Sequence, residues 1–318
     1  MISANLQVLQ TVVAFSVVVL VVILLKRLAV VRQEDGLVFS RLLIQAVLPA
    51  MIFFQLATRP IAGRQFLLVL AMIASVVLSL IVAGLAGLAM RLERSKIGVL
   101  MITSAFGSTS LMGYPLVQFA FPSNPHAMAD AVLISELGVG LPIFTLCPII
   151  AMYFGHARGD AGALRKALVD YVRSPIFVAL VAGLLVSQLH IPVTSAFIAP
   201  FSQAFRMIVG AFATLSCLIL GVQINFKGVW RILPLIAVSA LIQLAFQPFA
   251  AGLQGHLYHL DMDQRQVLVL VSSMPPAILG PVFATRFQCD GETASSVVFF
   301  DILLSIVTIP MAFQICAG

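Results

Sequence analysis

The sequence predicts an all-α polytopic membrane protein with ten transmembrane helices in two inverted five-helix repeats, in which helices 4 and 9 are broken crossover helices. Three observations predict this fold. Hydrophobic residues make up 61% and charged residues only 9% of the 318 residues, whereas soluble globular chains carry roughly 25% charged residues. Apolar stretches long enough to cross a bilayer recur along the whole chain. Two of these stretches are interrupted at matching places in the two halves of the chain.

Ten segments each hold the roughly 20 mostly apolar residues that a membrane span needs. They lie at about 6–25, 37–57, 66–90, 97–121, 127–154, 175–195, 198–224, 232–254, 266–287 and 293–315. A polar and basic stretch divides the ten spans five and five. We therefore expect a first five-helix repeat over residues 1–155, a cytoplasmic connecting loop over 156–174 and a second, inverted repeat over 175–318.

Lys and Arg residues are distributed unevenly between alternate loops. One set of loops holds 13 of them and the other set holds 3, while Arg41 and Arg206 lie inside spans. Because cytoplasmic loops are enriched in Lys and Arg, the first set should face the cytoplasm and both termini should lie outside. We expect a multi-pass protein of a bacterial-type cytoplasmic, or inner, membrane.

Other classes of protein are disfavoured by the same residues. The net charge of +6 follows the loops, so it indicates membrane orientation and no nucleic-acid partner. The four cysteines are scattered without CxxC spacing, which predicts neither a disulfide framework nor a zinc site. The chain has no P-loop and no recognisable catalytic constellation. We therefore expect a protein that is not an enzyme and that has no metal and no cofactor.

Three pairs of landmark residues relate the two halves. Their separations are 165 for Arg41 and Arg206, 165 for Glu136 and Asp301, and 166 for Pro115 and Pro281. With five spans in each half, corresponding helices run in opposite directions through the membrane, so the repeat must be inverted.

The interruptions in spans 4 and 9 consist of glycine and proline residues. Proline removes a hydrogen-bond donor and glycine tolerates unusual dihedrals, so helical bonds are lost there. Freed backbone groups are tolerated inside a membrane only where they face protein or a wet cavity. The candidate substrate-binding residues are therefore Ser108, Thr109, Gly113, Pro115, Ser273, Pro275, Pro276, Gly280 and Pro281. The alternative interpretation is a pair of proline kinks that only shape packing.

No Lys or Arg lies in either break. An anion would have to be held by hydroxyl groups and by backbone N–H groups, because a half-helix that starts near mid-membrane presents partial positive charge at its N-terminus.

Glu136 and Asp301 are predicted near the bilayer midplane. A carboxylate is costly at that depth, so such residues are often carriers of protons or cations. The alternatives are a salt bridge to Arg41 or Arg206, or a protonated acid bonded to a neighbouring carbonyl. Arg41 lies near the edge of its span, where it could reach the cytoplasmic face. Both arginines are also candidate countercharges for a substrate carboxylate.

Several segments resemble the auxin efflux carrier family, which includes bacterial permeases for malonate and similar organic acids and the plant auxin exporters. The segments that carry this resemblance are Leu48–Phe53, Met112–Leu116, Leu218–Gly221, Met274–Pro275, Pro281–Ala284 and Ser305–Pro310. The resemblance implies ten helices in two inverted repeats, with spans 4 and 9 crossing at their breaks beside a carboxylate substrate. It also implies an elevator-like movement of spans 3–5 and 8–10 against a scaffold of spans 1, 2, 6 and 7.

The chain departs from this family at two positions. Ser108 stands where the family often has Asn, and Asp301 stands where small or hydroxyl residues are frequent.

These features predict a secondary transporter for a small organic anion, such as malonate or an auxin-like acid. Ser108 and Thr109 would hold the carboxylate, and Glu136 and Asp301 would carry protons or assist a cation. Two alternatives remain: a sodium-coupled organic-anion symporter of the bile-acid type, and a non-transporting membrane sensor. The expected partners are the substrate anion, the lipid bilayer and a coupling proton or sodium ion, and a homodimer is compatible with the apolar helix faces.

Overall fold

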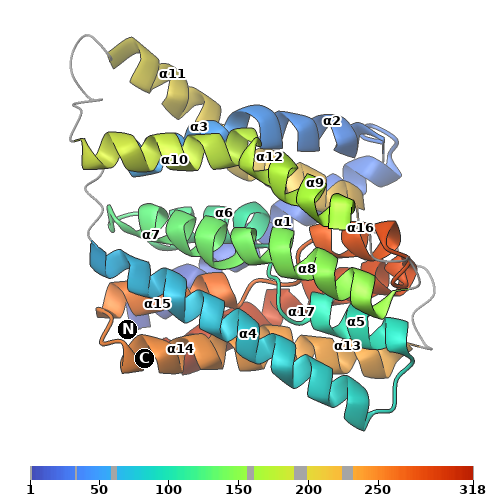
Figure 1. Cartoon of the computed structure of the whole chain (residues 1–318). Coiled ribbons are helices and arrows are strands. Elements are labelled where there is room, and N and C mark those ends of the chain that lie inside the picture. Colours follow the sequence, from blue (N-terminus) through green and yellow to red (C-terminus); the bar gives the residue numbers. More distant parts are fainter. Residues whose placement is uncertain are drawn as a thin grey trace.

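The computed structural model describes residues 2–32, 34–58, 63–155, 161–189, 199–223 and 232–317. Within these residues the regular structure is helical, and the one β-type pairing is an isolated bridge between Gly107 and Pro276. The N- and C-terminal ends of the chain lie at the same end of the bundle (Figure 1).

Seven helical stretches in the described part are long and apolar enough to cross a membrane. They are Asn5–Arg27, Val38–Ala57, Gly63–Ala89, Ala127–Phe154, Gln203–Val222, Leu233–Leu257 and Gly291–Cys316. Each coincides with one of the ten predicted spans. Two of the remaining three predictions, 97–121 and 266–287, fall on interrupted helices. The third begins as the short apolar helix Pro175–Gln188, and its predicted continuation from residue 190 lies outside the described residues.

In the first half of the chain the described residues form twelve helical elements before the connecting stretch, of which three are π-helical turns and one is a 3₁₀ turn. The helices and turns are α1 (Ile2–Arg27), α2 (Asp35–Leu42), η1 (Leu43–Val47), α3 (Leu48–Ala57), η2 (Gly63–Gln65), α4 (Phe66–Ala89), α5 (Arg94–Thr103), η3 (Thr109–Gly113), α6 (Tyr114–Ala120), α7 (Ala127–Leu133), η4 (Ile134–Gly140) and α8 (Leu141–Phe154). The predicted connecting loop contains a helix of its own, α9 (Ala161–Val172).

The second half is also built from α-helices and a π-helical turn. Its elements are α10 (Pro175–Gln188), α11 (Ala199–Gly210), α12 (Phe212–Gln223), α13 (Leu233–Ala240), η6 (Leu241–Phe246), α14 (Gln247–Leu257), α15 (Met262–Ser272), α16 (Leu279–Arg286) and α17 (Gly291–Cys316). The loop cations Lys227 and Arg231 fall outside the described residues.

Each π-helical turn has a proline two residues beyond its end. The turns η1, η3, η4 and η6 are followed by Pro49, Pro115, Pro142 and Pro248. Proline has no N–H group and its ring clashes with the carbonyl group four residues earlier. A π turn widens the helix there and relieves the clash. Such turns often occur at functional sites, and here two of them carry the buried polar residues Glu136 and Gln243.

The helices form two groups. In the first, α3 packs on α10 and α11, and α12 packs on α1 and α2. In the second, α5 packs on α4 and α8, these three helices pack with helices of the α13–α17 set, and α6 and α7 pack on α15. In Figure 1 α2, α3, α10 and α11 lie above, while α4, α5, α13, α14 and α15 lie below. Contacts of α1 with α6 and α17, and of α3 with α7, join the two groups.

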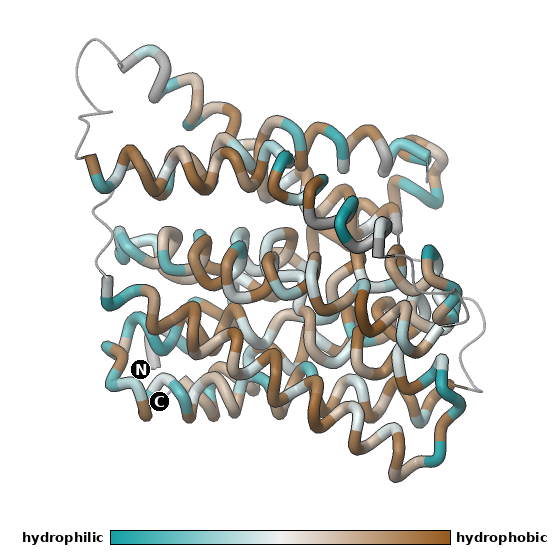
Figure 2. Tube along the Cα trace, in the orientation of Figure 1, coloured by the Kyte–Doolittle hydropathy of each residue, from teal (hydrophilic) through white to brown (hydrophobic). Residues whose placement is uncertain are grey.

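The outer surface suits a bilayer. Hydrophobic residues cover the lengths of the helices, and many hydrophilic segments lie towards the two ends of the bundle (Figure 2). Large apolar side chains such as Leu20, Leu85 and Leu88 are more than half exposed. Because water would penalise so much exposed apolar surface, these faces are best explained by contact with lipid.

Candidate functional site

The two broken helices pair with each other at their interruptions. The first ends at Thr103 and the second at Ser272, and a short irregular segment follows each of them. The Ser108 N–H donates to the Pro275 carbonyl at 2.7 Å, and the Ala277 N–H donates to the Phe106 carbonyl at 2.7 Å. Backbone groups freed by one break are therefore satisfied by the other break, as a buried location requires.

A third helix stabilises this crossing from the side. The Gln243 amide donates to the Met274 carbonyl at 2.9 Å, and the Gln247 amide donates to the Ala105 carbonyl at 2.8 Å. Both glutamines are fully buried. They lie one turn apart in the η6–α14 stretch, and the Gln243 amide also donates to the Gln247 side-chain oxygen at 2.6 Å. One backbone carbonyl group from each break thus accepts a hydrogen bond from a side chain of the same helix.

The absence of a side chain at Gly107 permits this close approach. A Cβ atom at Gly107 would lie 3.2 Å from Gln243 Nε2 and 3.2 Å from the Met274 carbonyl oxygen. Gly280 is also packed closely, since a Cβ atom there would lie 2.7 Å from Cγ2 of Ile102.

A cavity of about 430 Å³ lies beside the crossing, between the two groups of helices. The first group contributes Leu43, Ile44 and Leu48 from η1 and α3, with Ile176 from α10 and Ile219 from α12. The second group contributes Gly107–Leu111, Ala277–Leu279 and the η4 turn with Ser135 and Glu136. A ligand in this cavity would touch both groups at once.

Several polar groups at the cavity form one connected network. Thr109 Oγ1 lies 2.6 Å from Ser135 Oγ, and Ser110 Oγ lies 3.1 Å from the same atom. Oε1 of Glu136 accepts hydrogen bonds from Tyr114 at 2.6 Å and from Ser110 at 3.2 Å. The Tyr171 hydroxyl of α9 donates to the Glu136 backbone carbonyl at 3.1 Å. Glu136 is therefore fixed in place by hydroxyl groups.

The cavity lining favours an anion held without a basic side chain. Among the described residues, those that line the cavity include no Lys, Arg or His. The start of η3 and the segment leading into α16 both face the cavity, and the first N–H groups of a helix lack helical partners and carry partial positive charge. Together with the hydroxyl groups of Ser108, Thr109 and Ser110, they form a set of hydrogen-bond donors that suits a carboxylate.

Asp301 lies away from this lining, in the middle of α17 and fully buried. Its Oδ2 accepts a hydrogen bond of 2.8 Å from Ser239, whose hydroxyl is also 3.1 Å from Thr103 Oγ1 at the end of α5. The second oxygen, Oδ1, has no hydrogen-bond partner. The two acids at matching positions thus occupy different environments.

The predicted site residues divide between the cavity and its support. Ser108 and Thr109 line the cavity. Pro275 and Pro276 form the backbone pairing of the crossing. Gly113 is buried at the end of η3, Pro115 is buried in α6, and Gly280 lies against Ile102. Ser273 directs its hydroxyl to its own helix, donating to the Leu270 carbonyl at 2.8 Å.

Arg41 and Arg206 are both exposed on the first group of helices. The salt bridges found in the described residues are Arg32–Glu34, Arg64–Asp261 and Lys96–Glu93. The ion pairs considered for Glu136 and Asp301 are therefore not formed among the described residues.

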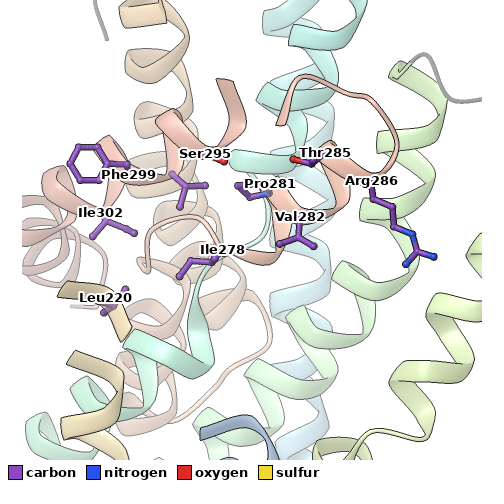
Figure 3. A pocket seen from close by; sticks show the side chains of 10 residues that line it. Leu220, Ile278, Pro281, Val282, Thr285, Arg286, Ser295, Phe299 and Ile302 are labelled. Atoms are coloured by element: carbon purple, nitrogen blue, oxygen red, sulfur yellow. The ribbon is translucent and has the colours of Figure 1, made fainter. Parts of the chain in front are cut away.

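Pro281 lines a second cavity, of about 530 Å³, on the α17 side of α16. Figure 3 shows its largely apolar lining, in which Pro281, Val282 and Ile278 lie near Leu220, Phe299 and Ile302, while Arg286 lies at one edge. Ile278 borders both cavities.

Several residues of the site were not singled out from the sequence. Ser135 and Tyr114 could have been found as neighbours of an intramembrane acid, one adjacent in sequence and one on a broken helix. Ser239, Gln243 and Gln247 lie on an unbroken span, and only the fold brings them to the crossing. Tyr171 lies in a stretch that was expected to be a loop.

Comparison with known proteins shows that the sequence of this chain is similar to those of transporters. Residues 162–313 match the family described as membrane transport protein. The chain is 25% identical to an uncharacterized transporter of Methanothermobacter thermautotrophicus over 95% of this chain and 96% of that protein. It is 20% identical to one of Methanocaldococcus jannaschii over 92% and 96%. An uncharacterized transporter of Escherichia coli K12 is 21% identical over 57% of this chain and 54% of that protein.

Proposed function

We propose that this chain, which belongs to the membrane transport protein family, is a secondary transporter that carries a small organic carboxylate across the cytoplasmic membrane. The observation that carries the proposal is the cavity at the crossing. It combines two half-helix starts, three serine or threonine hydroxyls and a buried carboxyl group. Folding has already removed water from these hydrogen-bond donors and fixed their positions, so they can bind a carboxylate without a further cost of burial.

The proposed topology has ten spans in two inverted repeats, with both termini outside. The charge bias of the loops and the common offset of three residue pairs support it. The paired breaks correspond to crossover helices 4 and 9.

The proposed movement is of the elevator type. The cavity lies between two groups of helices that contact each other through few elements, and the crossing belongs wholly to one of them. Displacement of that group against α1, α3, α10 and α12 would carry the cavity and its ligand towards the other side of the membrane.

Proton coupling follows from the position of Glu136 in the cavity wall. Two carboxylates about 4 Å apart repel each other by roughly 4 kcal/mol at the effective dielectric of a protein. An anionic substrate therefore binds most favourably when Glu136 carries a proton, so the proton and the substrate would move together. In this proposal Glu136 and Asp301 are the coupling residues, and they occupy separate sites.

Uptake of radiolabelled malonate into proteoliposomes tests the proposal. Ser108→Ala and Thr109→Val should each lower uptake at least about tenfold, because a buried hydrogen bond to a charged group is worth about 1.5–3 kcal/mol. Thr145→Val is the matched control, because its hydroxyl bonds only to its own helix. Glu136→Gln should abolish the acceleration of uptake by an inward proton gradient.

Undiminished uptake in both Ser108→Ala and Thr109→Val would overturn the assignment of the cavity. Saturable binding of malonate without any transport by the unaltered chain would instead identify a membrane sensor.

A further inference from the structure

We propose that the buried oxygen atoms around Asp301 form a binding site for a sodium ion. This site is separate from the carboxylate cavity, because Asp301, Ser239, Thr103 and Ser104 are not among the residues that line the cavity.

The first observation is a set of buried oxygen atoms that have no partner. Asp301 Oδ1, Ser104 Oγ and Gln243 Oε1 are all buried and none makes a hydrogen bond. A buried polar atom without a partner costs free energy comparable to a lost hydrogen bond, and a charged one costs more. Three such atoms on packed elements indicate that something beyond the protein completes them.

The second observation is that the fold brings these elements together. Ser239 connects α13 to both neighbours, because its hydroxyl lies 2.8 Å from Asp301 Oδ2 and 3.1 Å from Thr103 Oγ1. Ser104 follows Thr103 directly, and Gln243 lies one turn beyond Ser239. The helix α17 packs against α5, α13 and η6, so the elements that carry or adjoin these oxygen atoms pack together in the core.

The third observation is the electrostatic character of that region. The helix α5 ends at Thr103, and the last carbonyl groups of a helix lack helical donors and carry partial negative charge. Asp301 adds a carboxyl group, and no ion pair to it is formed in the described part of the chain. Carboxylate, hydroxyl, amide and carbonyl oxygens are the ligands that hard cations take.

The composition of the region favours a monovalent ion. A single carboxyl group balances a single positive charge, whereas divalent cations are usually held by several carboxylates. A proton on Asp301 would complete only one of the unpartnered oxygen atoms. Sodium ions in other transporters are coordinated by carbonyl groups at the ends of broken helices, and the end of α5 offers such groups here.

The sodium site gives Asp301 a distinct part in the proposed coupling. A sodium ion would compensate the negative ends of the crossing helices on one side, while the carboxylate would compensate the positive ends on the other. This part of the inference rests on the proposed function. The binding of sodium itself does not, because it can be measured without any substrate.

Direct binding of radioactive sodium ion to the purified full-length protein in detergent tests the site. The unaltered chain should bind ²²Na⁺ saturably, and NaCl should raise its melting temperature relative to choline chloride at equal ionic strength, since a ligand that binds only the folded state stabilises it. Asp301→Asn should weaken binding at least about a hundredfold, because it removes the carboxylate charge that faces the ion. Ser239→Ala should weaken it at least about threefold.

The matched control is Asp130→Asn. Asp130 is another buried acid within a span, and Gln65 donates to it. This variant should bind sodium like the unaltered chain. Thr103→Val is a second test variant in case Asp301→Asn fails to fold. It retains every charged residue, and it should also weaken sodium binding.

Sodium binding that persists unchanged in Asp301→Asn would overturn the inference. So would a melting temperature that responds to pH but not to sodium, which would mean that Asp301 takes a proton. Malonate uptake by a chain that binds no sodium would refute the site and leave the proposed transport function intact.

Discussion

The side-chain amide of Gln243 donates a hydrogen bond of 2.9 Å to the carbonyl oxygen of Met274, inside the break between α15 and α16. Gln247 does the same at 2.8 Å for Ala105 in the other break. The geometry of the crossing therefore depends on two side chains of the continuous η6–α14 stretch.

Gln243→Leu should destabilise the protein and impair transport. It leaves the Met274 carbonyl without a donor in a buried place, which costs about 1–3 kcal/mol. The midpoint of thermal unfolding in detergent should fall, and malonate uptake per folded molecule should fall with it. Gln254→Leu is the control. Gln254 lies farther along the same helix as Gln247, and its amide donates to Ser75 of α4 at 3.1 Å, away from the crossing. Equal uptake by the two variants would contradict a role for Gln243 at the crossing.

Gly107→Ala should lower stability through crowding. The added Cβ atom would lie 3.2 Å from both Gln243 Nε2 and the Met274 carbonyl oxygen, and overpacking of this kind typically costs about 1–3 kcal/mol. Chemical unfolding in detergent followed by circular dichroism measures the loss. Gly210→Ala adds the same atom where nothing lies within 4 Å. If both variants unfold at the same denaturant concentration, the close approach at Gly107 does not matter.

Tyr114→Phe should destabilise the cavity wall with little change in volume. The variant removes the 2.6 Å hydrogen bond from the Tyr114 hydroxyl to Glu136, and hydrogen bonds to charged groups are worth about 1.5–3 kcal/mol. Thermal unfolding should show a lower midpoint than for Tyr153→Phe, whose ring is 64% exposed on α8. A midpoint for Tyr114→Phe as high as that of the control would argue against this bond.

Single cysteines should report the orientation in the membrane. Ser123 lies in a connection predicted outside and Glu93 in one predicted inside, and both are exposed. In a chain whose four native cysteines are replaced by Ser, an impermeant maleimide added to intact cells should label Ser123→Cys. It should label Glu93→Cys only after the membrane is permeabilised. The reverse pattern of labelling would invert the proposed topology.

The breaks and the acids could be predicted from the sequence because their signals are local. Proline and glycine inside an apolar run interrupt a helix wherever the run lies, and a carboxyl group in such a run is costly in any fold. Glu136, Ser108 and Thr109 accordingly lie in the cavity wall.

The supporting residues could not be predicted because their signals are tertiary. In the sequence, a glutamine that bonds to a carbonyl group of another helix cannot be distinguished from one that bonds within its own helix. Gln243 and Gln247 acquire their role only because α13 to α14 lie beside both breaks. Ser273 shows the converse case, since it stands next to a break yet bonds within its own helix.

The four turns that precede Pro49, Pro115, Pro142 and Pro248 alter the phase of their spans. A π turn closes its hydrogen bond over one more residue than an α turn, and one residue of an α-helix corresponds to a rotation of about 100°. A helical wheel drawn through spans 2, 5 or 8 therefore loses its phase after Val47, Gly140 and Phe246. Scanning mutagenesis along these spans should show a tolerance pattern that jumps at those three residues and keeps its period on either side.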